Sequence, residues 1–141
     1  DAKIALSQGG TSSEDTDFGF VPLLSFAADY RFADRWYLLF CSDTETQSPA
    51  RRRLGAGTGT YCLVADDRYG PYRMIGDGAL EADPAGSTYA GRIHRSGDGT
   101  PWFLAWNRAA PDGSFLGELG DPRRVHVAPD GSLRLERVPL P

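Results

Sequence analysis

The most informative segment of this sequence is the apolar run Arg35-Trp36-Tyr37-Leu38-Leu39-Phe40-Cys41. Aromatic and branched side chains of this kind favour β-strands, and a nearly continuous apolar run is typical of a strand covered on both faces. The run Gly59-Thr60-Tyr61-Cys62-Leu63-Val64-Ala65 has the same character. Shorter apolar runs at 18–26 and 72–75 flank this pair. The four runs together predict a unit of four strands.

A second series of strand-like runs follows at 88–93, at 102–106, at 115–119 running on towards 124–127, and at 133–138. Asp-Gly between strand-like runs is a strong hairpin signal, because Gly accepts the positive φ that tight turns need. Such signals separate the runs of this series at Gly97-Asp98-Gly99, Pro111-Asp112-Gly113 and Pro129-Asp130-Gly131.

The two series share one order of elements. Each opens with a short strand, continues with a Trp-containing strand (Trp36 or Trp102), a loop and a strand that begins at Gly, and closes with a short outer strand. A repeated four-strand unit is typical of propeller blades, and an eight-stranded β-sandwich is the alternative. The expected fold class is all-β, with about two four-stranded antiparallel blades of a β-propeller. We expect the blades at 17–80 and 81–141, and the outer strand of a preceding blade with its connection at 1–16.

Two blades cannot close a propeller ring. Exposed sheet faces and edges favour association, and repeat units bury their core against neighbours. We therefore expect either further blades in a longer polypeptide or assembly with copies of the chain or with another partner. The sequence begins with Asp1 and not with Met, which favours an excised segment of a longer protein.

Composition excludes several classes of protein. A length of 141 residues is normal for one domain, and 17 Gly and 10 Pro favour many short strands joined by turns. The net charge of −4 argues against a general nucleic-acid or anionic-membrane surface. No apolar run approaches the roughly 20 residues needed to span a bilayer. We expect a soluble protein, and the sequence does not distinguish a secreted protein from a cytoplasmic one. The basic cluster Arg51-Arg52-Arg53 is expected to be a solvated loop.

Cysteine and histidine give no sign of a metal or cofactor. Cys41 and Cys62 lie on two runs that could pair antiparallel, so either a disulfide or two buried thiols is compatible with the sequence. His94 and His126 have no Cys or carboxylate neighbours at metal-ligand spacing. We expect no metal and no cofactor.

The order of motifs over residues 17–138 resembles that of glycoside hydrolase family 32, the β-fructosidase and levanase type. The run 35–42 resembles the family's Trp-Tyr-Leu-Leu-Phe-Ser strand, and 59–72, ending in Gly70-Pro71-Tyr72, resembles the next strand and its Gly-Pro turn. The segments 89–92, 102–106, 117–122 and 130–133 continue in the family's order. The resemblance implies the C-terminal blades of a five-bladed propeller with an axial funnel. It also implies hydrolysis or transfer of β-fructosyl groups (sucrose, levan or inulin type) with retention.

Such enzymes use one carboxylate as the nucleophile and a second as the acid/base. The family's Asn-Asp-Pro and Arg-Asp-Pro motifs do not occur here; the superficially similar segments 31–34 and 120–122 are expected in turns. The acid/base Glu before Val-Pro corresponds to Phe20. If the alignment is displaced by a few residues, Glu14 or Asp17 would serve instead. We therefore expect no catalytic residue in this chain.

The remaining candidates for a site follow from the geometry of propellers, in which the first strand of each blade faces the axis. They are candidates for substrate binding, since aromatic rings stack on sugars and polar groups bind hydroxyls: Phe20, Tyr89 and Arg92 on such strands, and Trp106 and Asn107 at the end of a neighbouring strand. Packing between blades is the alternative role of Tyr89 and Trp106. The expected ligand is a carbohydrate, a fructoside, bound either by part of a glycosidase or by a non-catalytic carbohydrate-binding or assembly module.

Overall fold

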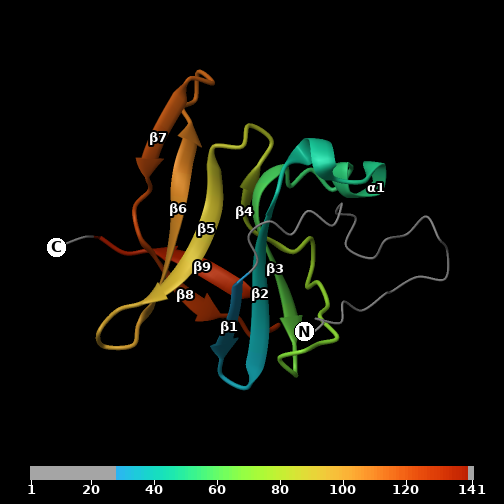
Figure 1. The fold of residues 1–141 in the computed structure, drawn as a ribbon, viewed down its shortest axis with the longest axis vertical. Helices are drawn as coiled ribbons and strands as arrows, with labels where there is room; N and C mark the ends of the chain where they lie inside the picture. Colours follow the sequence, from blue (N-terminus) through green and yellow to red (C-terminus); the bar gives the residue numbers. More distant parts are fainter. Residues whose placement is uncertain (1–27, 140–141) are drawn as a thin grey trace.

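The computed structural model of the chain describes residues 28–139 (Figure 1). These residues form an all-β fold, as expected, with one turn of 3-10 helix and one short α-helix. The elements in chain order are β1 Ala28–Phe32, β2 Arg35–Ser42, η1 Thr44–Thr46, α1 Pro49–Arg52, β3 Thr58–Ala65, β4 Ala79–Asp83, β5 Thr88–Arg95, β6 Pro101–Ala109, β7 Phe115–Leu119, β8 Arg123–Val127 and β9 Leu133–Arg137. Neither helix in this part of the chain is long enough to cross a membrane.

The first sheet is antiparallel, with the strand order β1-β2-β3-β4. Its central strands β2 and β3 coincide with the two apolar runs of the sequence. Strand β1 pairs with β2 along its whole length, so Arg31 and Phe32 are in a strand and not in the predicted turn. The run predicted at 18–26 lies outside the described residues.

The outer strand of this sheet is β4, and the prediction of an outer strand at 72–75 was wrong. In that run Tyr72 and Arg73 form isolated bridges and no strand, and the bridge of Arg73 is to Val64 of β3. Gly76 and Gly78, both with positive φ, then turn the chain back to the same edge of β3. There β4 pairs along Thr58–Tyr61, so two segments share one edge.

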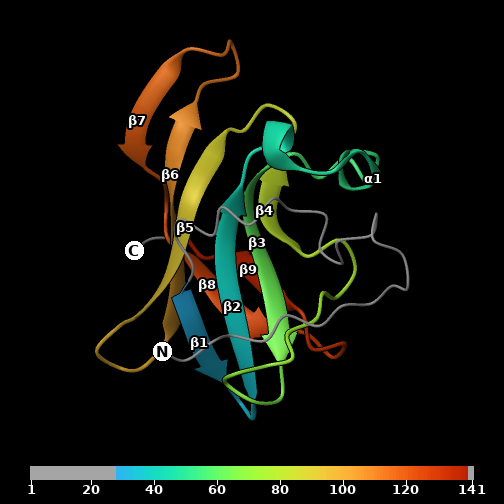
Figure 2. The same ribbon diagram turned by 45° about the vertical axis from the view of Figure 1, so that its right-hand side comes forward.

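The second sheet has the order β5-β6-β8-β9, and β7 pairs with β6 as well. Strand β7 pairs with the end of β6, at Trp106 and Asn107, whereas β8 pairs with its beginning, at Trp102 and Phe103. Together β7 and β8 form one interrupted third strand, which agrees with the predicted run from 115 towards 127. The β6–β7 hairpin extends beyond the rest of the sheet (Figure 2).

The three predicted turns of this sheet share one stabilising interaction. Asp98, Asp112 and Asp130 each accept a hydrogen bond from the backbone N–H two residues further on. Serine hydroxyls bind the same carboxylates, and these hydrogen bonds lower the pKa of Asp98 to about 2 and also lower the pKa of the other two. The turns are therefore held by side-chain acceptors that their own sequence supplies.

The two sheets pack face to face around a common core (Figures 1 and 2). Sheet one contributes Phe32, Tyr37, Leu39 and Val64, and sheet two contributes Ile93, Phe103, Ala105, Val125 and Leu133. A second cluster on the opposite face of sheet one contains Leu38, Phe40, Tyr61, Leu63, Ala65 and Tyr72. Strands β2 and β3 thus bury side chains on both faces, as their continuous apolar character predicted.

Close approach of the sheets depends on Gly91 of β5. Its N–H donates to Thr60 Oγ1 of β3 at 3.0 Å. A Cβ at this position would lie 2.6 Å from Thr60 Oγ1 of the first sheet and 2.2 Å from Cζ of Phe103 in its own sheet, so the space between the sheets has no room for a side chain here. Tyr37 Oη adds a second link, a 2.9 Å hydrogen bond to the carbonyl oxygen of Gly131. These contacts fix β5 and the β8–β9 turn of the second sheet against the first sheet.

The structure shows whether the two cysteines form a disulfide and whether Arg51 is exposed to solvent. Cys41 and Cys62 are free thiols, offset by two residues across the β2–β3 pair, and burial raises the pKa of Cys62. The prediction that Arg51 is solvated was wrong, because its side chain is 5% exposed and its guanidinium lies 5.2 Å from the ring centroid of Tyr61. A cation above a buried aromatic ring is stabilised by the ring's electron density.

Candidate functional site

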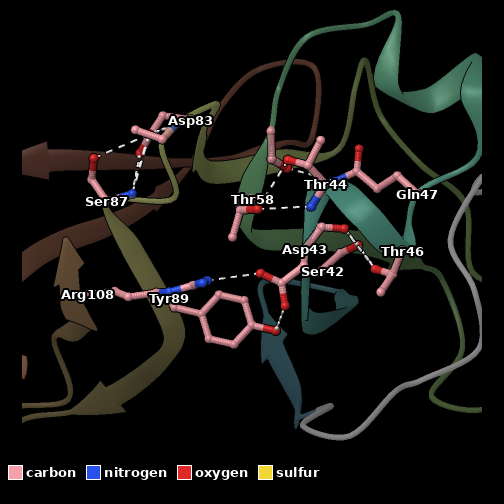
Figure 3. Close-up of polar contacts among 12 residues, drawn as sticks. Ser42, Asp43, Thr44, Thr46, Gln47, Thr58, Asp83, Ser87, Tyr89 and Arg108 are labelled. Carbon is pink, nitrogen blue, oxygen red and sulfur yellow. Dashed lines mark hydrogen bonds and ion pairs between the residues drawn. The ribbon is translucent and has the colours of Figure 1, made fainter. Parts of the chain in front are cut away.

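The candidate site begins with Asp43, the residue that follows β2. Asp43 occupies the N-cap position of η1, where an Asp side chain usually accepts a hydrogen bond from the helix backbone. Its carboxylate makes no such bond here. The carboxylate is instead directed towards the second sheet (Figure 3).

Two side chains of the second sheet meet this carboxylate. Tyr89, at the start of β5, donates its hydroxyl to Asp43 Oδ2 at 3.3 Å. Arg108, near the end of β6, forms an ion pair with Asp43 Oδ1 at 3.0 Å. The Arg108 guanidinium also lies 5.8 Å from the centroid of the Tyr89 ring. We call these three residues the Asp43–Tyr89–Arg108 cluster.

The cluster is polar but accessible. The Asp43 and Arg108 side chains are 41% and 45% exposed, respectively. Burial, and then the negative charge of Asp43, raise the pKa of Tyr89 to about 12. The phenol therefore stays protonated at neutral pH and acts as a hydrogen-bond donor.

Backbone contacts hold the cluster in place. The backbone N–H of Arg108 donates to the carbonyl of Ser87 at 2.8 Å. Ser87 is in turn held by Asp83, which accepts from its N–H at 3.1 Å and from its hydroxyl at 3.3 Å. On the other side, Thr44 N–H donates to Thr58 Oγ1 at 2.9 Å and fixes the backbone beside Asp43. Figure 3 shows the Asp83–Ser87 and Thr44–Thr58 contacts on either side of the cluster.

The predicted site residues do not gather at one point. Tyr89 belongs to the cluster, and its cross-strand neighbour Trp106 packs edge-on against Phe115 with 5.5 Å between ring centroids. Arg92 donates to the carbonyl of Gly91 at 3.1 Å. Phe20 lies outside the described residues.

Asn107 instead lines a cleft of about 530 Å³ between the edge of sheet one and the second sheet. Alternation along β6 places Asn107 on the same face as the buried Phe103 and Ala105, away from Trp106. The described residues around the cleft come from β4, β5, β6 and the segments 120–123 and 137–139. Asn107 is therefore separated from Trp106 by the sheet itself.

Asp43 and Arg108 were not among the predicted site residues. Asp43 was part of a polar stretch after β2, and Arg108 followed the predicted Trp106 and Asn107 directly. The sequence signal that could have indicated them is their position, because each follows shortly after the end of a predicted strand. Within residues 28–139 no group of three or more His, Cys, Asp or Glu side chains is arranged to hold a metal ion.

The chemistry open to this cluster is hydrogen bonding. A carboxylate, a phenol and a guanidinium within one contact network offer both donors and acceptors. Such groups recognise hydroxyls of a bound ligand, and the Tyr89 ring adds an apolar surface beside them.

Solved structures with a similar fold include a glycoside hydrolase, an inulosucrase and a xylanase. A thermostable family-43 glycoside hydrolase matches 82% of this chain with 17% identity and a TM-score of 0.56. The inulosucrase of Halalkalicoccus jeotgali, solved with bound kestose, matches 82% with 21% identity and a TM-score of 0.58. An endo-1,4-beta-xylanase of Bacteroides thetaiotaomicron matches 79% with 13% identity and a TM-score of 0.55. No protein-family model matches the chain, and no curated protein is significantly similar to it.

These likenesses establish the fold. The two antiparallel sheets correspond to part of a five-bladed propeller of the glycoside hydrolase type, which favours blades over the alternative β-sandwich. The chain spans 36% of the family-43 hydrolase and 35% of the inulosucrase. It therefore has the extent of about two blades of that fold.

Proposed function

We propose that this chain is part of a family 32-like glycosidase propeller whose longer parent hydrolyses or transfers β-fructosyl groups with retention. The observation that carries the proposal is the ordered series of family 32-like motifs over residues 17–138, on a chain with the fold of five-bladed glycosidases. The inulosucrase among the similar structures, solved with kestose, supports a fructoside as the substrate.

In this proposal the Asp43–Tyr89–Arg108 cluster contacts sugar hydroxyls. The three residues lie at strand ends from both sheets, and their polar atoms are linked but partly exposed. A hydroxyl that approaches Asp43 meets an acceptor already oriented by two donors. Preorganised groups of this kind bind a ligand at a lower entropic cost than flexible ones.

The catalytic carboxylates are assigned to other blades of the parent. Retaining glycosidases need a nucleophile and an acid/base about 5–5.5 Å apart, and the family's motifs for these residues do not occur in this chain. Phe20, at the position corresponding to the acid/base Glu, cannot transfer a proton. This segment would then contribute part of the wall of the funnel and no reacting group.

The test is turnover by the complete natural protein. We expect release or transfer of fructose from sucrose, inulin or levan, and no product from xylan. In that protein, Asp43→Asn and Tyr89→Phe should each raise KM roughly 3- to 10-fold, the value of one net hydrogen bond.

The matched control is Asp34→Asn, an exposed Asp in the β1–β2 turn, at the opposite end of β2 from Asp43. Its KM should equal that of the unmodified protein. Product from xylan alone, or no product from any of the three fructosides, would contradict the proposal.

A non-catalytic carbohydrate-binding or assembly module is the second candidate, and Phe20 is the observation that favours it. Loss of a proton donor leaves the binding surface of a propeller intact. This candidate predicts that the complete protein binds a fructoside but does not cleave it. Binding without turnover would therefore replace the first proposal with the second.

A further inference from the structure

The cleft lined by Asn107 is separate from the Asp43–Tyr89–Arg108 cluster. It measures about 530 Å³, which falls within the ~300–1,000 Å³ range of small-molecule sites. None of the three residues of the cluster lines it. The charged and polar side chains among the described residues that line it are Glu81, Thr88, Asn107, Asp121, Arg123 and Arg137.

One side of the cleft is fixed by an ion pair between the sheets. Arg123 of β8 binds Glu81 of β4, and both side chains are only 18% exposed. The Arg123 guanidinium also lies 5.2 Å from the centroid of the buried Phe103 ring. A pair that is shielded from water and backed by a core aromatic ring holds its geometry. This part of the cleft is therefore preformed.

The position of Asn107 is also determined by its neighbours. Its side-chain amide lies 3.5 Å from Glu118 Oε1 across the β6–β7 pair. A Cβ on Gly120 would lie 2.8 Å from Asn107 Oδ1, so the absence of a side chain at 120 makes room for the amide. The amide offers donors and an acceptor beside the hydroxyl of Thr88, its cross-strand partner.

The charges around the cleft balance. Glu81 and Asp121 are opposed by Arg123 and Arg137. Arg123 and Arg137 face each other across the β8–β9 pair, an arrangement that is unfavourable for like charges without a compensating group. Glu81 compensates Arg123, while Arg137 and Asp121 are exposed. An ion of either sign would meet a repulsive partner, whereas an uncharged ligand rich in hydroxyls would find donors and acceptors of both kinds.

The apolar part of the lining fits the same class of ligand. Pro122, Val138 and Pro139 present hydrocarbon surface beside the polar groups. A sugar ring has hydroxyls at its edge and C–H groups on its faces, so it can satisfy both parts of the cleft at once. A planar anion or an apolar ligand would leave one part unmatched.

We propose that this cleft is a second binding site, for a short neutral oligosaccharide, in addition to the cluster at Asp43. The ligand class rests on the proposed function, but the site does not require the chain to take part in catalysis. Asn107 and Arg137 bind the hydroxyls of the sugar, and the proline and valine side chains pack against its ring.

The test is titration of the full 141-residue chain with kestose, followed by 15N NMR and calorimetry. Asn107 is the only Asn in the chain, so its side-chain amide gives a distinct signal. We expect kestose to shift this signal and the backbone signals of Thr88 and Gly120. Asn107→Leu and Arg137→Gln should each raise the Kd for kestose roughly 3- to 10-fold, the value of one net hydrogen bond.

Arg134→Gln is the matched control, because Arg134 is on β9 as well but does not line the cleft. It should bind kestose as tightly as the unmodified chain. Arg137 is exposed, so Arg137→Gln keeps the test valid if Asn107→Leu fails to fold.

Unchanged kestose affinity in both cleft variants would contradict the proposed site. Changes in NMR signals confined to Asp43, Tyr89 and Arg108, or the absence of any change on addition of kestose, would contradict it too. If inorganic phosphate shifts the cleft signals and kestose does not, the cleft is an anion site and the proposal is wrong. These failures are distinct from failure of the proposed function, which is measured by turnover of the complete protein.

Discussion

Replacing Phe103 with alanine is expected to lower the free energy of unfolding by about 3–5 kcal/mol. Phe103 is 0% exposed and lies at the centre of the core that joins the two sheets. Its ring packs against the backbone of Gly91, where no side chain can enter, and beneath the guanidinium of Arg123. The neighbours are rigid strands, so they will not collapse into the cavity. A loss of this size is a large fraction of the ~5–15 kcal/mol that stabilises a typical protein.

Urea unfolding followed by circular dichroism measures this loss. Phe115→Ala is the matched control, because Phe115 is on the same sheet but 72% exposed. Its truncation should change the free energy of unfolding by less than about 1 kcal/mol. Similar losses in the two variants would mean that the sheets do not share the core described above.

Gly57→Ala is the second substitution with a large expected effect, a loss of about 2–5 kcal/mol from left-handed backbone strain and steric overlap together. Gly57 has φ +88°, and a Cβ on it would lie 2.2 Å from the carbonyl oxygen of Asp83. Because that atom belongs to the backbone of β4, the clash cannot be relieved by turning a side chain. The carbonyl of Gly57 also accepts hydrogen bonds from Gln47, at 2.7 Å, and from Tyr61.

Gly55→Ala separates the two contributions to that loss. Gly55 has a similar φ of +78°, but a Cβ on it would have no neighbouring atom within 4 Å. Its substitution should cost only the backbone strain, about 1–2 kcal/mol. Thermal or urea unfolding of the two variants gives the difference, and equal losses would show that the contact with β4 is not as close as described.

The strands that could be predicted from the sequence are those whose own side chains favour a strand. The runs that became β2, β3 and β6 are rich in aromatic and branched residues, and the turns after β5, β6 and β8 carry Asp-Gly. By contrast, β4 has the sequence Ala-Leu-Glu-Ala-Asp, which has little intrinsic preference for a strand. It is extended because the edge of β3 supplies its hydrogen-bond partners. Pairing of this kind depends on the tertiary fold and has no local signal.

The same distinction holds for the candidate site. Tyr89 could be predicted because it stands near the start of a recognisable strand. Asp43 and Arg108 are 65 residues apart and meet only because the two sheets pack together. The burial of Arg51 likewise depends on the ring of Tyr61 in another element. Contacts between distant segments determine these features, and a reading of separate motifs does not reveal them.

The central claim is that this chain forms about two blades of a larger propeller. The most direct measurement is the intact mass of the natural protein, determined by mass spectrometry under denaturing conditions, which excludes any contribution from assembly. We predict a mass several times the 15.3 kDa of the chain, in keeping with its 36% and 35% shares of the similar structures. A mass near 15.3 kDa would contradict the claim, because two blades would then have to bury their open faces by self-assembly.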